Sequence, residues 1–164
     1  MSEFICGYLS IKDIKGESKH KKYNDMISII NLKHSVSNSA TLNQKTGLCA
    51  GTPIIGEVTL EIVYDKSSTA LRDYLFKGKH IPEASIFMLT SSSGEEEKKF
   101  YVIEMKKVMV TLCTTSYDSA CTYANTIICL AFEEFTEIYT GQTFDGKSAA
   151  DVSGGYNIKT KEIT

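Results

Sequence analysis

Apolar and polar residues alternate along much of the chain, and the alternation is clearest between Gly56 and Tyr64. In that segment Val58, Leu60 and Ile62 are separated by single polar residues. A period of two places successive side chains on opposite faces of a β-strand. The segment is therefore predicted to be a strand with one face in the core and the other in water.

Five further segments are rich in β-branched and aromatic residues and are also predicted to be strands. They are Phe4 to Ile14, Met26 to Lys33, Ser85 to Thr90, Phe100 to Cys113 and Thr126 to Tyr139. The two longest exceed the usual strand length of about 5 to 6 residues, so we expect each to bend or to contain a bulge. Between two of these strands, Ser91 to Glu97 is predicted to form a hairpin tip that its glutamates keep in water.

One segment, Ser67 to Gly78, carries the signals of a short amphipathic helix. Ser67 or Ser68 is the expected N-cap, apolar residues follow at helical spacing, and Gly78 is suited to end the helix. Pro82 then favours an extended chain.

The stretch from Ser35 to Gly56 shows no clear periodicity and is longer than most loops of compact domains, which is typical of functional loops. Taken together, the pattern predicts a mainly β fold. We expect a single domain over residues 1–164, built as an antiparallel β-barrel or sandwich of about seven or eight strands with one short flanking α-helix.

The small net charge and the short apolar segments of the chain argue against several classes of partner. The net charge of -2 argues against a protein that neutralises many phosphates, so no nucleic-acid partner is expected. Residues 1–82 carry +3 and residues 83–164 carry -5, an asymmetry compatible with head-to-tail self-association. No apolar run approaches the roughly 20 residues of a spanning helix, and the N-terminus lacks the apolar region of a signal peptide. We expect neither stable membrane insertion nor a cleaved leader.

Reactive residues do not form a recognisable catalytic or metal-binding pattern. The five cysteines contain no CxxC pair and are expected to be reduced and mostly buried, which indicates folding in the cytosol. The histidines at 20, 34 and 80 are not spaced for a Cys/His site, and His20 is expected to be a solvated loop residue. Paired carboxylates at Glu133, Glu134 and Glu137 are better explained as charges on the exposed face of a sheet. We therefore expect no catalytic residue, metal or other cofactor, and a protein that binds or assembles.

Three blocks of sequence carry a family resemblance. They are GYLSIKDIKGES at Gly7 to Ser18, YDKSSTALRDYLFKGKHIPEASI at Tyr64 to Ile86, and GYNIKTKEI at Gly155 to Ile163. Their order and spacing resemble the hemolysin-coregulated protein (Hcp) family, the tube-forming proteins of bacterial type VI secretion systems. The chain lacks the tryptophans that this family often has near Met26 to His34.

The resemblance implies a fold similar to that of phage tail-tube proteins, and subunits that form homohexameric rings stacked head to tail into a hollow tube. It also implies a contractile sheath, a spike protein and a baseplate as partners, and small effector proteins carried in the lumen. The protein would then occupy the bacterial cytoplasm until firing and be secreted without a cleaved signal peptide.

The Ser35 to Gly56 stretch corresponds in position to the family's ring-contacting loop, although it lacks the usual glycine-rich run. The residues expected to make contacts across subunits or rings are Leu48, Cys49, Thr52, Ile54 and Ile55. The alternative is that the apolar residues of this loop fold back onto their own barrel. Two other functions stay open: a small β-barrel that binds a ligand, and a cysteine-dependent hydrolase.

Overall fold

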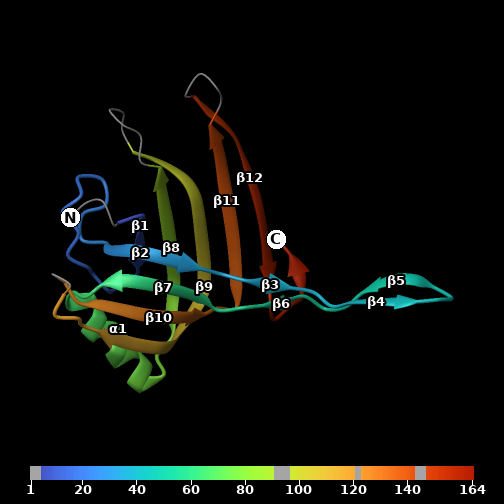
Figure 1. Cartoon of the computed structure of the whole chain (residues 1–164), viewed down its shortest axis with the longest axis horizontal. Coiled ribbons are helices and arrows are strands. Elements are labelled where there is room, and N and C mark those ends of the chain that lie inside the picture. Colours follow the sequence, from blue (N-terminus) through green and yellow to red (C-terminus); the bar gives the residue numbers. More distant parts are fainter. Residues whose placement is uncertain (1–4, 91–96, 121–122, 143–146) are drawn as a thin grey trace.

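The computed structural model describes residues 5–90, 97–120, 123–142 and 147–164 (Figure 1). Of the predicted hairpin tip at Ser91 to Glu97, only Glu97 belongs to the described residues. The cysteine at position 121 also lies outside them. The described strands are β1 (Gly7–Ile11), β2 (Ile27–Lys33), β3 (Val36–Ser37), β4 (Ala40–Asn43), β5 (Gly47–Ala50), β6 (Ile54–Ile55), β7 (Val58–Val63), β8 (Ile81–Thr90), β9 (Lys98–Ser116), β10 (Asn125–Ala131), β11 (Glu134–Gln142), β12 (Ser148–Asn157) and β13 (Glu162–Ile163); α1 spans Lys66–Lys77.

Six antiparallel strands close into a barrel in the order β10, β7, β2, β1, β8 and β9, and β10 completes the closure by pairing with β9. The alternating aliphatic residues of β7 point inward and are fully buried, so the predicted strand and its inner face are confirmed. Burial of such a side chain stabilises the fold by about 1.5–3 kcal/mol. The largest fully buried side chains are Leu9, Ile27, Ile29, Leu60, Ile62, Leu71, Ile81, Ile86, Ile103, Met105, Ile128 and Leu130.

The long strand β9 belongs to two parts of the molecule. Its first half lies between β8 and β11, and its second half pairs with β10. The transition falls near Lys107, which has a left-handed φ of 52°. Strands β12 and β13 extend the sheet beyond β11, outside the barrel (Figure 1). The segment predicted as one strand from Thr126 to Tyr139 is in fact two strands, β10 and β11, separated at Phe132 and Glu133.

The N-cap of helix α1 lies two or three residues earlier than predicted. Asp65, not Ser67 or Ser68, is the N-cap, and its carboxylate accepts the backbone N–H of Ser67 at 2.8 Å. Ser68 is the third helical residue, and its side chain accepts the backbone N–H of Asp65, which completes a capping box. Gly78 ends the helix in the left-handed conformation, as predicted.

The stretch at residues 35–56 is more ordered than its sequence suggests and is called the arm below. Strand β3 pairs with β6 and β4 pairs with β5, so the arm is a ribbon of two short antiparallel ladders. It continues the direction of β2 and β7 and extends away from the barrel on the side opposite α1 (Figure 1). The predicted fold class, a mainly β antiparallel barrel with one flanking helix, is confirmed.

Candidate assembly interface

The base of the arm is fixed to the barrel by a histidine and by backbone hydrogen bonds. The Gly56 N–H donates to the Ser35 carbonyl oxygen at 2.9 Å, and Nε2 of His34 donates to the Gly56 carbonyl oxygen at 3.1 Å. The His34 ring also packs edge-on against Phe132 and Phe135, at centroid distances of 5.8 and 5.3 Å. His34 therefore links the start of the arm to the buried aromatic residues beside the barrel.

The outer part of the arm has one apolar and one polar face. Leu42 lies opposite Leu48 in the β4–β5 ladder, and alanines are paired two residues further along. Residues directly opposite in a ladder share a face, so these four side chains form one surface, whereas Thr41 and Cys49 occupy the other. Leu42 is 76% exposed and Leu48 is 73% exposed. Two leucines thus lie side by side in water on an isolated ribbon.

The turn of the arm fixes this register. The Asn43 side-chain oxygen accepts the backbone N–H of Lys45 at 3.0 Å, and Gly47 adopts a φ of +81° that other residues rarely tolerate. Three residues connect β4 to β5, a common hairpin length when a left-handed glycine follows. Lys45, at the tip, is the only charged residue of the arm.

The predicted contact residues fall into two groups. Leu48, Cys49, Thr52 and Ile54 are exposed on the arm, whereas Ile55 is partly buried and packs against the core of its own barrel. Ile55 therefore follows the alternative in which the loop residue folds back. Val36 and Leu42 are also exposed apolar residues of the arm, and sequence reasoning missed both. The pairing of Leu42 with Leu48 was not visible without the register.

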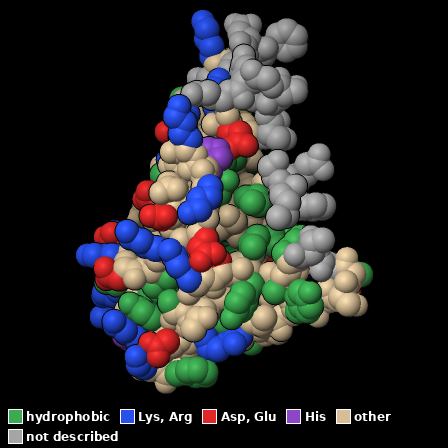
Figure 2. All heavy atoms as spheres, turned by 90° about the vertical axis from the view of Figure 1, so that its left-hand side faces the viewer, with side chains coloured by type: hydrophobic (Ala, Val, Ile, Leu, Met, Phe, Trp, Pro, Cys, Tyr) green, Lys and Arg blue, Asp and Glu red, His purple; other side chains and the backbone are tan. Residues whose placement is uncertain are grey.

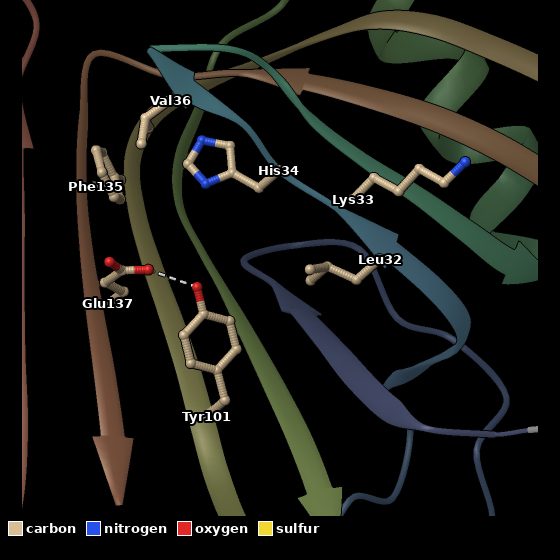
Figure 3. Close-up of a pocket in the computed structure, with 7 residues that line it drawn as sticks. All are labelled: Leu32, Lys33, His34, Val36, Tyr101, Phe135 and Glu137. Carbon is tan, nitrogen blue, oxygen red and sulfur yellow. Dashed lines mark hydrogen bonds between the residues drawn. The ribbon is translucent and has the colours of Figure 1, made fainter. Parts of the chain in front are cut away.

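A groove of about 470 Å³ lies beside the arm base, between the end of β2 and strands β9 and β11 (Figure 3). Leu32, Val36 and Phe135 form its apolar part. Tyr101 points toward Glu137 across the groove and donates a hydrogen bond of 2.6 Å to its carboxylate (Figure 3). Burial, together with this carboxylate, raises the pKa of Tyr101, so the phenol stays protonated and acts as a donor.

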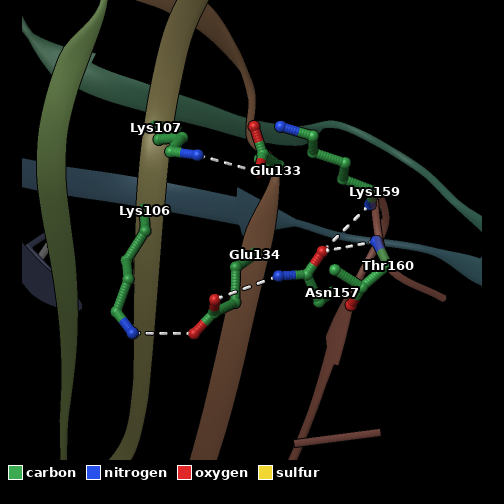
Figure 4. Close-up of polar contacts among 7 residues, drawn as sticks. All are labelled: Lys106, Lys107, Glu133, Glu134, Asn157, Lys159 and Thr160. Atoms are coloured by element: carbon green, nitrogen blue, oxygen red, sulfur yellow. Dashed lines mark hydrogen bonds and ion pairs between the residues drawn. The ribbon is translucent and has the colours of Figure 1, made fainter. Parts of the chain in front are cut away.

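The glutamates of β11 and the preceding turn form cross-strand pairs with lysines of β9 (Figure 4). Glu134 accepts from Lys106 at 2.7 Å, and Glu133 accepts from Lys107 at 2.9 Å. The Asn157 amide donates to the other Glu134 oxygen at 3.2 Å and so links β12 to the same pair. The hydrogen bond from Lys106 lowers the pKa of Glu134. These carboxylates therefore add side-chain links between strands that their backbone ladders already join.

His20 is less solvated than predicted. Its Nε2 lies 2.9 Å from a carboxylate oxygen of Glu97, and its ring contacts Tyr8 and Tyr23 at centroid distances of 5.4 and 5.1 Å. Over the described part of the chain, no group of three or more His, Cys, Asp or Glu side chains is placed to hold a metal ion. The described cysteines are free thiols. Cys6, Cys113 and Cys129 are half-buried and Cys49 is exposed, so the expectation of mostly buried thiols is wrong for the described cysteines.

The outer edge of β12 is a second surface suited to assembly. One side of β12 pairs with β11 along most of its length, but on the other side β13 pairs with only Tyr156 and Asn157. Within the described ranges, residues 149–154 have no neighbouring strand on that side. An open edge of this length is a template for pairing with another chain.

Also in the described residues, no helix is long and apolar enough to cross a membrane.

Comparisons with known proteins agree on one family. A family model described as "Type VI secretion system effector, Hcp" matches residues 8–145. Protein hcp1 of Pseudomonas aeruginosa is 27% identical over 153 residues, which cover 93% of this chain and 94% of that protein.

Solved structures share the fold at lower sequence identity. A type six secretion system protein superposes with a TM-score of 0.90 at 20% identity, covering 98% of this chain and 99% of the other. Hcp1 from Salmonella typhimurium superposes with a TM-score of 0.77 at 20% identity, covering 97% of this chain and 98% of the other. Because the family model spans most of the sequence, this chain belongs to the Hcp family of type VI secretion system effectors.

Proposed function

We propose that this protein is the structural subunit of a type VI secretion inner tube, in which six copies form a ring and rings stack head to tail. The observation that carries the proposal is the arm, which is fixed to its own barrel at the base and exposes Leu42, Leu48 and Ile54 to water. A two-stranded ribbon is at best marginally stable alone, so a second copy that covers its apolar face would stabilise it.

Ring closure would use a heterologous contact, in which each subunit presents one lateral surface to a different surface of the next. The open edge of β12 supports this part of the proposal, because a neighbouring strand would satisfy its free backbone groups. The charge asymmetry between the two halves of the chain would favour the same relative orientation of all subunits.

Family membership supports the rest of the cycle. The tube would assemble in the bacterial cytoplasm against the baseplate, inside a contractile sheath and behind a spike protein. Sheath contraction would export it without a cleaved leader, together with small effector proteins held in the ring lumen. The subunit would act mechanically and would need no cofactor and no catalytic residue.

Native mass spectrometry of the purified chain tests the oligomeric state, and a double substitution tests the arm. The wild type is expected as a six-subunit species. Leu48→Asp with Ile54→Asp is expected to keep the fold by circular dichroism but to lose rings or their stacking, because it places charge where apolar burial is needed. Thr41→Asp with Thr46→Asp adds the same charge to polar, exposed positions of the arm and is the matched control.

A wild-type chain that stays strictly monomeric at high concentration would overturn the tube proposal and favour a small β-barrel binding protein. If the Leu48→Asp, Ile54→Asp variant forms and exports rings as the control does, the arm is not the contact. Export of the wild type should also stop in a strain whose sheath cannot contract.

A further inference from the structure

The groove beside the arm base contains a carboxylate of which only one oxygen is engaged. Oε2 of Glu137 accepts the Tyr101 hydroxyl at 2.6 Å (Figure 3). The other oxygen has no hydrogen-bond or ion-pair partner among the described residues, and the Glu137 side chain is exposed. One carboxylate oxygen on the groove wall is therefore available to a ligand.

No lysine or arginine among the described residues neutralises this carboxylate. Lys33 also borders the groove, but Figure 3 shows its side chain extending away from Glu137, and it borders a separate groove together with Glu61. The neighbouring Glu133 and Glu134 each pair with a lysine. On the face of the molecule turned away from the arm, acidic and basic side chains lie next to one another (Figure 2). Glu137 thus differs from the carboxylates near it in facing a groove without a cation.

His34 supplies a second acceptor on the groove wall. Its Nε2 lies 3.1 Å from the Gly56 carbonyl oxygen, which can only accept, so Nε2 carries the proton. In the neutral ring Nδ1 is then an acceptor, and no described residue donates to it. The Tyr101 hydroxyl is already committed to Glu137. The free polar groups of this wall, one carboxylate oxygen and Nδ1, are therefore both acceptors.

The rest of the groove suits an aliphatic group. Leu32 and Phe135 pack against the core and are partly covered, whereas Val36 is 58% exposed beside them. A ligand that covered Val36 would remove apolar surface from water. The volume of about 470 Å³ lies within the range of about 300–1,000 Å³ that is typical of ligand clefts.

The hydrogen bond from Tyr101 also selects between the two kinds of organic cation found in proteins. A guanidinium binds a carboxylate best through two parallel hydrogen bonds, one to each oxygen. Tyr101 already occupies one of these oxygens, and because the pKa of Tyr101 is raised, the phenol keeps its proton and stays in place. An ammonium is a compact charge that needs only one oxygen. The geometry therefore favours an ammonium over a guanidinium.

We propose that this groove binds a primary ammonium group on an aliphatic stem, which is the chemistry of a lysine side chain or of a free alkylamine. The ammonium would donate to the free oxygen of Glu137, with Nδ1 of His34 as the second acceptor, and the stem would cover Val36 and Phe135. Tyr101 is a positioning residue that fixes the carboxylate. A ligand site of this kind goes beyond the assembly role proposed above and does not depend on it.

Saturation-transfer NMR titrations of the full chain with matched small probes test the site. Nα-acetyl-lysine N-methylamide is expected to bind about fivefold more tightly than the norleucine analogue, which has the same stem without the charge. The arginine analogue is expected to bind more weakly than the lysine probe. Equal affinity for the lysine and norleucine probes would overturn the proposal, and equal affinity for lysine and arginine would overturn the preference for an ammonium.

A fourth probe, n-pentylamine, distinguishes the two sources of the same chemistry. If it binds as tightly as the lysine probe, the groove recognises a free alkylamine. If it binds more weakly, the groove also recognises the flanking amides and so takes a lysine side chain of another protein. Binding of neither probe would reject the site.

Substitutions identify the groups responsible. Glu137→Gln is expected to remove the preference for lysine over norleucine. Glu104→Gln makes the same change of charge at an exposed position on the opposite face of β9 and is the matched control. Tyr101→Phe frees the second carboxylate oxygen and should shift the preference from lysine toward arginine, whereas a purely structural role would weaken every probe equally.

A Glu137→Gln variant that keeps the lysine preference, or a Glu104→Gln variant that loses it to the same extent, would reject the groove. Circular dichroism checks that each variant is folded. Native mass spectrometry of the same samples reports rings separately, so a failure of ligand binding with rings intact rejects only this site. Absence of rings in the wild type rejects only the proposed function.

Discussion

Replacing Asp65 with alanine should destabilise the fold well beyond the loss of one helix cap, because this carboxylate joins two segments. One oxygen accepts the Ser67 N–H at 2.8 Å and the Ser67 hydroxyl, and the other accepts the Glu17 N–H at 3.0 Å. Asp65 therefore accepts a free N–H group at the start of α1 and also ties the loop between β1 and β2 to the helix.

The expected size of the effect follows from these contacts. Loss of an N-cap costs about 0.5–2 kcal/mol. The bond to Glu17 involves a charged acceptor but an exposed donor, which reduces its contribution to about 1 kcal/mol. A total of about 2 kcal/mol corresponds to a fall in Tm of about 4–8 °C for a domain of this size. Asp65→Asn should recover part of the loss, since asparagine is also a good N-cap.

Thermal unfolding followed by circular dichroism measures the shift, with all variants at equal protein concentration because subunit association also raises Tm. The control is Asp73→Ala, which removes an exposed pair with Lys77 on the same helix. That pair is expected to contribute about 0.3–0.5 kcal/mol. Hydrogen exchange should also rise at the Glu17 amide in Asp65→Ala alone. If Asp65→Ala melts within 1 °C of Asp73→Ala and Glu17 stays protected, the joint role of this carboxylate is refuted.

Three further outcomes are expected. Iodoacetamide should label the exposed Cys49 faster than Cys6, because burial raises the pKa of the Cys6 thiol. Peptide mass spectrometry measures both rates, and faster labelling of Cys6 would contradict the structure. Pairing with Lys106 lowers the pKa of Glu134, so its stabilising effect is present above the unfolded pKa of about 4.3 and is lost as pH falls through the lower folded value. The difference in Tm between wild type and Glu134→Gln should therefore shrink from about pH 5 to pH 3, and a constant difference would count against the pair. His34→Ala should loosen the arm base and raise proteolysis within residues 35–56 while leaving barrel amides protected, and uniform loss of protection would instead indicate a core role.

The barrel and helix were predictable because their residues repeat with the period of the element they form. The alternation at Val58, Leu60 and Ile62 specifies a strand with one buried face, and the strand is present where predicted. Strand β12 gave no such signal, since Ser148–Asn157 contains mostly small residues and two glycines. It is a strand because β11 pairs with it along its length, which is a tertiary cause that no local pattern reports.

The N-cap of α1 shows how a local rule can select the wrong residue. Asp65, Ser67 and Ser68 are all good N-caps, so the sequence allowed more than one start. The structure selects Asp65 because two independent donors, the Ser67 and Glu17 N–H groups, converge on its carboxylate. The Glu17 donor comes from a segment 48 residues away and could not enter a local argument.

In the arm, the sequence identified individual apolar residues but not the face on which they lie. Single apolar residues such as Leu48 and Ile54 could be singled out in a polar segment, but which face they share depends on the register of the ribbon. That register is set by the left-handed Gly47 and the Asn43 side chain, and a shift of one residue would place Leu42 and Leu48 on opposite faces. The turn therefore gathers two leucines on one side of the tip and leaves Lys45 at its end. In the contact between copies proposed above, these two turn residues would decide which apolar surface the arm presents.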